Sequence, residues 1–414
     1  MDNYLRPIFR FYADVILCYN KTKFMRLITL KNAPVFGKKV LLRAGFDVPF
    51  DKNGHISDDE RIRESLPSIK YLIKKKAKLV IISHNGRPEG KYVKKLAMNE
   101  VAERLSQLLK QKVYKLNDCV GKEVERFVNQ MKPGQVVLLE NLRFHKEEEK
   151  NDIYFAKELA RLADLYVNDA FSNSHRPHAS MVGISQYLPS YAGFLVEKEV
   201  KALSEILLKP KHPFVAIVGG AKISDKLKTI INLFHKTDAM LIGGAIANTI
   251  LKAHGLQVGK SLIESEMVAK VKKLNLTDVR LKIPVDVVVS DRISPASKAW
   301  LRPAGKVKKE EIILDIGEDT IKLFKAIIVK ARQIIWAGPM GYFESKKFAQ
   351  GSIEIAKALA KSKAKTIVGG GDTLHVLDIL HLKNKFSFVS TGGGAMLKFL
   401  EGASLPALKP LMKK

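Results

Sequence analysis

Short runs of aliphatic, largely β-branched residues recur along this chain and alternate with helix-length amphipathic segments. The runs are Val40–Arg43, Leu79–His84, Val136–Asn141, Leu165–Phe171, Phe214–Gly220, Met240–Gly244, Pro284–Asp291, Gln333–Pro339, Lys365–Asp372 and Phe386–Gly394. Continuous apolar runs are typical of strands buried on both faces of a parallel sheet. The segments between them include Arg61–Lys76, Leu96–Lys112, Ile153–Asp164 and Ile353–Lys361. This alternation predicts repeated βαβ units and therefore an α/β fold.

The length of 414 residues, 46% of them hydrophobic, favours two domains over one core. Residues 195–208 have helical apolar spacing and are followed by Pro210 and Pro213, so we place the domain connection there. We expect two Rossmann-like lobes, each a mainly parallel sheet flanked by helices. The expected boundaries are 25–194, an interdomain helix at 195–208, 209–392, and a segment 393–414 that returns to the first domain.

The chain ends and the cysteines suggest the setting of the protein. Residues 1–24 do not fit the βαβ scheme, so we expect a poorly ordered N-terminal extension before Met25 without an assigned function. No apolar stretch of about 18 residues is present, so no membrane span is expected. Cys18 and Cys119 are the only cysteines and make no disulfide framework, which favours the cytoplasm.

The net charge of +29 has two interpretations. A basic protein can bind nucleic acid. The lysines, however, are scattered, as at 74–76 and 306–309, without a basic arm or zinc-finger spacing. We therefore favour solvated lysines that attract small anions, and expect neither nucleic acid nor membrane as a partner.

Cationic residues follow the strand-like runs of the first half. Ligands of parallel sheets bind at the carboxyl ends of strands. Arg87, Arg143 and Arg176 follow three of these runs, and Arg61 opens the first long helix. Each alone is more simply a surface residue, but together their guanidinium groups suit a phosphate and a carboxylate.

Glycines follow the strand-like runs of the second half. The turns are Gly219-Gly220, Gly243-Gly244, Gly338-Pro339-Met340-Gly341, Gly369-Gly370-Gly371 and Gly392-Gly393-Gly394. One such turn is weak support, since sharp turns need glycine anyway. Five of them suggest backbone amides and helix N-termini that hold nucleotide phosphates. We expect Lys222 and Lys226 to share one helix face, and Asp372 to suit Mg²⁺.

From about Met25 to the C-terminus the sequence resembles the phosphoglycerate kinase family. The resemblance rests on Ser83–Pro88, Glu140–Phe144, Asp169–Phe171 with His175-Arg176, Gly219–Lys226, Trp336 with Gly338–Glu344, Gly369–Thr373 and Ser390–Gly402. It implies reversible phosphoryl transfer from 1,3-bisphosphoglycerate to Mg-ADP, giving 3-phosphoglycerate and Mg-ATP. Because the expected anion sites lie on two separate lobes, we also expect hinge closure about residues 195–208, and we expect a monomer.

The resemblance assigns roles to residues at matching positions. Those implied to bind phosphoglycerate are Asp47, Arg61, His84, Asn85, Gly86, Arg87, Arg143 and Arg176. Those implied to bind nucleotide are Gly220, Lys226, Gly243, Gly244, Glu344, Gly369, Gly370, Gly371, Asp372 and Thr373, with Asp372 also holding Mg²⁺. Those implied to stabilise the transferring group are Lys222, Arg61, Gly393 and Gly394.

The sequence departs from the family pattern at several positions. Gly45 and Asp47 stand where the family usually has Asp and Asn, Ala337 replaces Asn, and Ser172-Asn173-Ser174 replaces Gly-Thr-Ala. An ionised Asp47 only accepts hydrogen bonds and repels a carboxylate. Two alternatives therefore stay open: a catalytically weakened relative that binds nucleotide or nucleic acid, and a kinase for another carboxylate.

Overall fold

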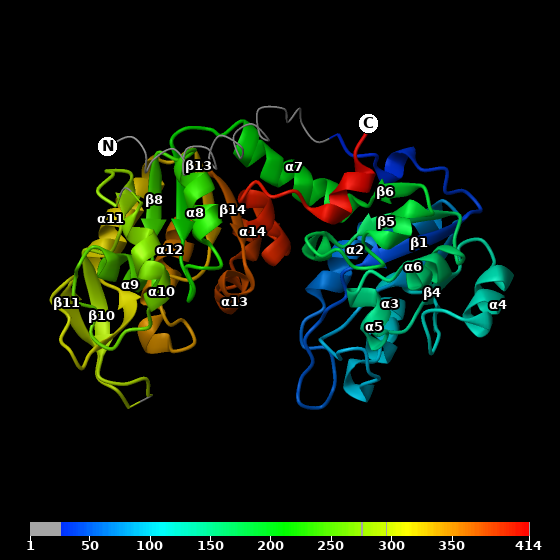
Figure 1. Cartoon of the computed structure of the whole chain (residues 1–414), viewed down its shortest axis with the longest axis horizontal. Helices are drawn as coiled ribbons and strands as arrows, with labels where there is room; N and C mark the ends of the chain where they lie inside the picture. The colour runs from blue at the N-terminus through cyan, green and yellow to red at the C-terminus, as the bar shows by residue number, and fades with distance from the viewer. Residues whose placement is uncertain (1–25, 275, 295, 414) are drawn as a thin grey trace. The chain divides into compact units, whose positions relative to one another are not determined.

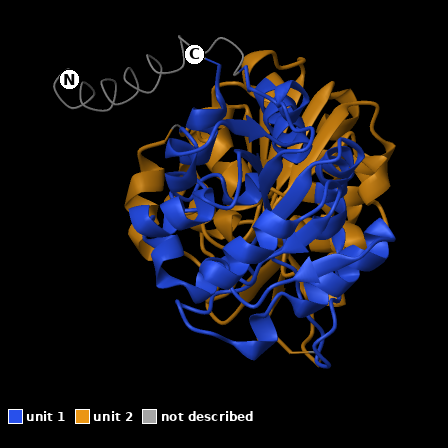
Figure 2. Ribbon diagram, turned by 90° about the vertical axis from the view of Figure 1, so that its right-hand side faces the viewer, with its two compact units in different colours: residues 1–204, 404–414 blue, residues 205–403 orange. Residues whose placement is uncertain are grey.

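The computed structural model describes residues 26–274, 276–294 and 296–413. The expectation for residues 1–24 lies outside these. The chain forms two compact units, coloured separately in Figure 2. Unit 1 extends to Ser204 and resumes at Ser404, and unit 2 comprises Glu205–Ala403.

Unit 1 contains a six-stranded sheet in the order β3-β4-β2-β1-β5-β6, in which all neighbours are parallel. Its strands, labelled where visible in Figure 1, are β1 (Lys39–Ala44), β2 (Lys78–Ile82), β3 (Val113–Lys115), β4 (Val136–Leu138), β5 (Leu165–Asp169) and β6 (Ser190–Ala192). Its helices are α2 (Glu60–Lys74), α3 (Asn99–Leu109), α4 (Lys122–Gln130), α5 (Lys146–Glu149) and α6 (Ile153–Ala160).

Both faces of this sheet are buried, as the continuous apolar runs predict. Val40 and Leu42 of β1 belong to one hydrophobic cluster with Ile69 of α2. Leu41 between them belongs to a second cluster with Phe155 of α6. Successive side chains of a strand point to opposite faces, so consecutive positions such as Val40, Leu41 and Leu42 are all apolar.

Unit 2 contains a second six-stranded parallel sheet, in the order β15-β14-β13-β7-β8-β9. Its strands are β7 (Phe214–Val218), β8 (Ala239–Ile242), β9 (Leu281–Lys282), β13 (Gln333–Ala337), β14 (Lys365–Gly369) and β15 (Phe388–Ser390). Its helices are α8 (Leu227–Phe234), α9 (Gly244–Ala253), α10 (Ser265–Lys272), α11 (Glu318–Lys330), α12 (Gln350–Lys361), α13 (Gly371–Ile379) and α14 (Gly394–Leu400). The prediction of two mainly parallel sheets flanked by helices is confirmed.

The apolar run Pro284–Asp291 does not join the parallel sheet. Its core, β10 (Asp286–Ser290), is the centre of a three-stranded antiparallel sheet between β11 (Trp300–Pro303) and β12 (Ile312–Ile316). Val287 and Val289 are buried in a small core of their own. A buried central strand has the same apolar pattern in either kind of sheet, so the sequence could not separate the two.

Helix α7 (Phe194–Leu208) contains the division between the units, after Ser204. The C-terminal segment joins unit 1 from Ser404, not from residue 393 as expected. Helix α14 stays with unit 2 because Thr229 and Asn232 of α8 donate hydrogen bonds to its last carbonyls. After it, the Ala407 amide donates to the Ser174 carbonyl oxygen at 3.2 Å.

In the described part of the chain, every helix is too short or too polar to traverse a lipid bilayer.

Candidate functional site

The carboxyl ends of β1, β2, β4 and β5 bring the predicted cationic residues of unit 1 to one sheet edge. These four strands are neighbours in the sheet, so the loops that follow them start side by side. Asp47 follows β1, and Gly86 and Arg87 follow β2. Arg143 lies in a 3₁₀ turn (Leu142–Phe144) after β4, and Arg176 lies beyond β5.

Asp47 connects three of the predicted residues. The Gly86 amide donates to its Oδ1 at 2.9 Å. One guanidinium nitrogen of Arg61 donates to its backbone oxygen at 2.7 Å and lies 3.4 Å from Oδ2. His84 Nε2 lies 3.8 Å from the same Oδ2. The structure therefore brings Asp47, Arg61, His84 and Gly86 together.

Arg143 has a guanidinium group that is only partly satisfied. Its side chain is 4% exposed, NH1 donates to the Gly86 carbonyl oxygen at 2.7 Å, and Nε lies 3.1 Å from Glu149. NH2 is buried without a hydrogen-bond partner among the described residues. Because an unpaired buried donor is costly, this nitrogen is suited to an anion.

Arg87 and Arg176 are the free cations of the edge. Arg87 is exposed and Arg176 is half-buried. Within the described ranges, neither guanidinium group makes an ion pair or a side-chain hydrogen bond. Asn85, by contrast, is buried. Its backbone carbonyl oxygen accepts a hydrogen bond from the side-chain amide of Asn141.

A buried polar network that the sequence reasoning did not assign lies behind this edge. Arg43 donates to Ser180 Oγ at 3.1 Å and lies 2.9 Å from His84 Nδ1. The Ser180 hydroxyl in turn donates to Glu148 at 2.6 Å. Arg43 is the one charged residue between Val40 and Ala44 of β1, and it is the sequence signal for this network, since a buried charge needs a partner. Glu148, inside a charged helical turn, gave none.

His84 and His178 are neutral. Burial, followed by the charges of Arg43 and Arg143, holds the pKa of His84 well below its usual range. The same causes lower the pKa of His178 to about 3. Both rings therefore offer hydrogen bonds and no charge at neutral pH.

Gly45 and Ser172 face each other across the ends of β1 and β5. A Cβ added at Gly45 would lie 3.5 Å from Ser172 Oγ. The hydroxyl therefore adjoins the space that a side chain at position 45 would enter.

Unit 2 has a cavity of ≈ 240 Å³ at the ends of its strands. Four predicted nucleotide residues line it: Gly220, Gly244, Glu344 and Asp372. Its wall is largely apolar and includes Leu262, Ile293, Leu314, Met340 and Phe343. An apolar pocket with a few polar groups is typical of small-molecule sites.

Two glycines of this site are required by the backbone. Gly244 has φ +63°, and a Cβ there would lie 2.6 Å from the Gly220 amide nitrogen. A Cβ on Gly338 would lie 2.2 Å from the Gly219 carbonyl oxygen. Gly243 does not line the cavity. A Cβ on Gly243 would lie 2.7 Å from the sulfur of Met340, which does line it.

Lys222 and Lys226 do not share a helix face, which corrects the prediction. Helix α8 begins at Leu227, because the residues before it form a turn after β7. Lys226 Nζ donates to the carbonyl oxygens of Gly219 (2.6 Å) and Ala337 (3.3 Å). Burial lowers its pKa to about 8, although Asp372 favours the charged form. Lys222 is exposed.

The start of α13 presents Asp372 to solvent. β14 ends at Gly369, Gly370 has φ +100°, and the Thr373 hydroxyl accepts from the Gly338 amide at 2.6 Å. A Cβ at Gly371 would meet no atom within 4 Å, so packing does not require that glycine. A Cβ at Gly393, which precedes Gly394 at the start of α14, would also meet no atom within 4 Å, but its φ of +50° favours glycine.

Comparisons with known proteins agree with this arrangement. The family described as Phosphoglycerate kinase matches residues 30–403. The phosphoglycerate kinase of Dictyoglomus turgidum is 48% identical over 94% of this chain and 99% of its own length. That of Pelotomaculum thermopropionicum is 47% identical over 93% and 99%.

Solved structures give the same result. The phosphoglycerate kinase of Coxiella burnetii covers 93% of this chain and 98% of its own, with a TM-score of 0.83 and 42% identity. That of Pyrococcus horikoshii gives 0.81 and 34% identity over the same shares.

Proposed function

The chain belongs to the phosphoglycerate kinase family, and we propose that it moves a phosphoryl group from 1,3-bisphosphoglycerate to ADP. The bond between phosphorus and the carboxyl oxygen breaks, and a bond to a terminal ADP oxygen forms. The observation that carries the proposal is the set of incompletely paired guanidinium groups at the strand ends of unit 1. The expected products are 3-phosphoglycerate and ATP, and the reaction is reversible.

The acidic metabolite belongs to the cationic edge of unit 1. NH2 of Arg143 and the guanidinium groups of Arg87 and Arg176 would bind its phosphate or carboxylate, because guanidinium forks match both groups. Neutral His84 and the Asn85-Gly86 turn would position its oxygens. Asp47 would keep Arg61 in place through the contacts described above.

Ser172 supplies a hydroxyl beside Gly45, where the family pattern has a carboxylate. We propose that Ser172 Oγ, not residue 45, contacts the substrate hydroxyl in this chain. A serine hydroxyl can both donate and accept, so it can replace a carboxylate that only accepts.

The nucleotide belongs to the cavity of unit 2. The apolar wall suits a base, and Glu344 lies in the lining where a ribose hydroxyl needs an acceptor. The amides at Gly220, Gly369, Gly370, Gly371 and Thr373 would bind phosphates, as strand-to-helix turns do elsewhere.

Mg²⁺ fits the donors at the start of α13. Asp372 is exposed and lines the nucleotide cavity, and Mg²⁺ prefers one or two carboxylates together with phosphate oxygens and waters. Asp372 would hold the ion, which when bound supplies positive charge beside the nucleotide phosphates. Lys226 donates a hydrogen bond to the Gly219 carbonyl oxygen, and the negative charge of Asp372 favours the charged form of its amine.

Charge on the transferring phosphoryl group would be stabilised by Lys222, Arg61 and the amides at Gly393 and Gly394. Such transfer needs positioning and charge stabilisation more than proton transfer. It also needs donor and acceptor in line, and a hinge at α7 remains our prediction for meeting that need.

The remaining expectations accompany this proposal. We propose a cytoplasmic monomer that uses neither nucleic acid nor a membrane. The described cysteine, Cys119, is free and buried.

A coupled turnover assay with Mg-ATP and 3-phosphoglycerate tests the proposal. We expect saturable formation of 1,3-bisphosphoglycerate, with catalytic efficiency that falls as salt rises, because the basic surface attracts anionic substrates. The alternative of a weakened binding protein predicts no turnover but salt-sensitive binding of duplex DNA. Turnover with a different carboxylate substrate, and none with 3-phosphoglycerate, would instead show a kinase for that carboxylate.

A further inference from the structure

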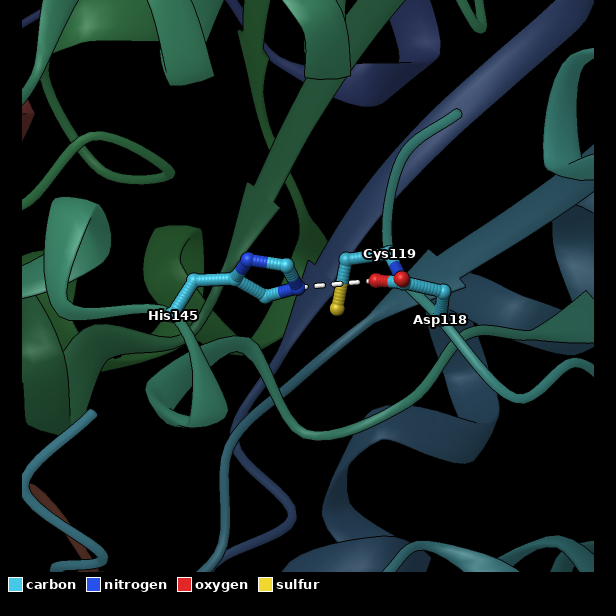
Figure 3. Close-up of side chains that lie close together, drawn as sticks. All are labelled: Asp118, Cys119 and His145. Carbon is cyan, nitrogen blue, oxygen red and sulfur yellow. Dashed lines mark hydrogen bonds and ion pairs between the residues drawn. The ribbon is translucent and has the colours of Figure 1, made fainter. Parts of the chain in front are cut away.

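Asp118, Cys119 and His145 place three metal-ligating atoms close together in unit 1 (Figure 3). The His145 ring nitrogen Nε2 lies 2.8 Å from Asp118 Oδ1. The carboxylate, thiol and imidazole donor atoms all lie within 4.8 Å of one another. None of the three belongs to the phosphoglycerate or nucleotide sites proposed above.

We propose that these three residues form a binding site for Zn²⁺. Zinc bonds of about 2.0–2.3 Å in a tetrahedron place neighbouring ligand atoms roughly 3.3–3.7 Å apart. Small side-chain rotations therefore convert the observed cluster into a zinc site. The fourth position would be taken by water.

The backbone holds the ligands in place before any metal binds. Asp118 and Cys119 follow β3, and His145 follows the turn after β4, its neighbour in the sheet. The Glu140 amide donates to the Asp118 carbonyl at 3.4 Å, and Cys119 Sγ lies 2.9 Å from the Glu140 carbonyl oxygen. The His145 ring stacks on Phe155 at 4.9 Å.

The accessibility and charge of the cluster also suit a divalent ion. The side chains of Asp118 and His145 are 53% and 28% exposed, so an ion can reach these two ligands from solvent, whereas Cys119 is buried. An aspartate, a thiolate and a neutral imidazole together carry two negative charges, which Zn²⁺ neutralises. On binding, the Cys119 thiol loses its proton to water and a Zn–S bond forms.

The three donor atoms select against Mg²⁺, the ion proposed to bind at Asp372. Mg²⁺ prefers oxygen ligands in octahedral geometry, whereas thiolate and imidazole favour zinc.

Calorimetric titration of the full chain with Zn²⁺, in a Cys18→Ser background with millimolar Mg²⁺, tests the site. We expect one zinc per chain. Cys119→Ser and His145→Gln should each weaken binding by at least the roughly 10- to 100-fold seen when even an outer partner of a zinc ligand is lost. Cobalt in place of zinc should give thiolate charge-transfer absorption that Cys119→Ser removes.

His212→Gln is the matched control. His212 pairs with Asp238 at 2.6 Å, but this pair belongs to no three-ligand group in the described residues. Its substitution should leave zinc affinity unchanged. Absence of saturable zinc binding in the parent protein, or equal affinity in Cys119→Ser, would overturn the proposal. If Cys119→Ser fails to fold, His145→Gln and the cobalt spectrum decide.

Discussion

In the function proposed above, the two sheet edges bind anions by different means. Unit 1 uses side chains: Arg143 is held by Gly86 and Glu149, while a buried network of Arg43, Ser180 and Glu148 lies behind. Unit 2 uses the backbone, with turns so close that a Cβ at Gly244 or Gly338 would collide with a neighbouring turn. Side-chain recognition is specific for shape and charge, whereas amide recognition suits the phosphates common to all nucleotides.

Lys222 is the one exposed cation proposed to act within the glycine-rich edge of unit 2, and removing it should have the largest effect. Lys222→Ala should lower kcat by about 10²–10³, as loss of one transition-state donor does. Stability should not change, because the side chain is exposed. The turnover assay and a melting curve measure both effects. Lys228→Ala, an exposed neighbour, should be silent, and near-normal turnover of Lys222→Ala removes Lys222 from the mechanism.

A buried carboxyl in each unit should make stability depend on pH. Burial raises the pKa of Asp169 from 3.8 to about 8 and that of Asp315 to about 7. Each stabilising contribution is therefore complete below about pH 4 and is lost as pH rises through the folded pKa. Asp169→Asn and Asp315→Asn should each gain stability relative to the parent between pH 5 and pH 8.

Denaturant unfolding across that pH range measures this gain. Asp278→Asn is the control, because its pKa is lowered to about 2 and it stays ionised throughout. If the difference in unfolding free energy between Asp169→Asn and the parent does not change with pH, the Asp169 carboxyl is not held neutral by the fold.

Gly244 and Gly371 of unit 2 distinguish a glycine that the fold requires from one that nucleotide binding requires. Gly244→Ala should cost about 1–3 kcal/mol of unfolding free energy, from its positive φ and the contact with Gly220. Gly371→Ala should cost nothing, since its Cβ meets open space, but should weaken nucleotide binding. Urea unfolding and ADP titration measure the pair. Equal stability losses would mean that Gly371 serves the fold.

The smallest effect is expected at Asp47, the acidic exception in the cationic edge of unit 1. Asp47→Asn should lower the KM for 3-phosphoglycerate by roughly three- to tenfold, or about 1 kcal/mol, because a repelled carboxylate gains a donor. Steady-state kinetics measure it. Glu103→Gln, the same charge change on an exposed part of α3, should have no effect. A raised KM for Asp47→Asn would show that the Asp47–Arg61 contact matters more.

The sequence predicted the longer parallel strands well because burial on both faces makes them largely apolar, as in Val40, Leu41 and Leu42 of β1. It missed β3, β6 and β9, which are only two or three residues long. It assigned β10 to the wrong sheet, because partner choice depends on β11 and β12, which lie elsewhere in the sequence.

The site was predictable where it depends on motifs and unpredictable where it depends on packing. Glycine turns and strand-end arginines are visible as patterns. That Lys226 donates to the Ala337 carbonyl oxygen, or that Glu148 lies behind Arg43, depends on contacts between residues distant in the sequence.

One experiment tests most directly whether unit 1 binds the phosphoglycerate and unit 2 binds the nucleotide. Calorimetry would measure the binding of 3-phosphoglycerate and of ADP to two variants, the double variant Arg87→Ala/Arg176→Ala and the single variant Asp372→Ala. The arginine variant should lose 3-phosphoglycerate binding and keep ADP binding. The aspartate variant should lose the Mg²⁺-dependent part of ADP affinity and bind 3-phosphoglycerate normally. If both variants lose both ligands equally, or if 3-phosphoglycerate binds without the arginines, the account is wrong.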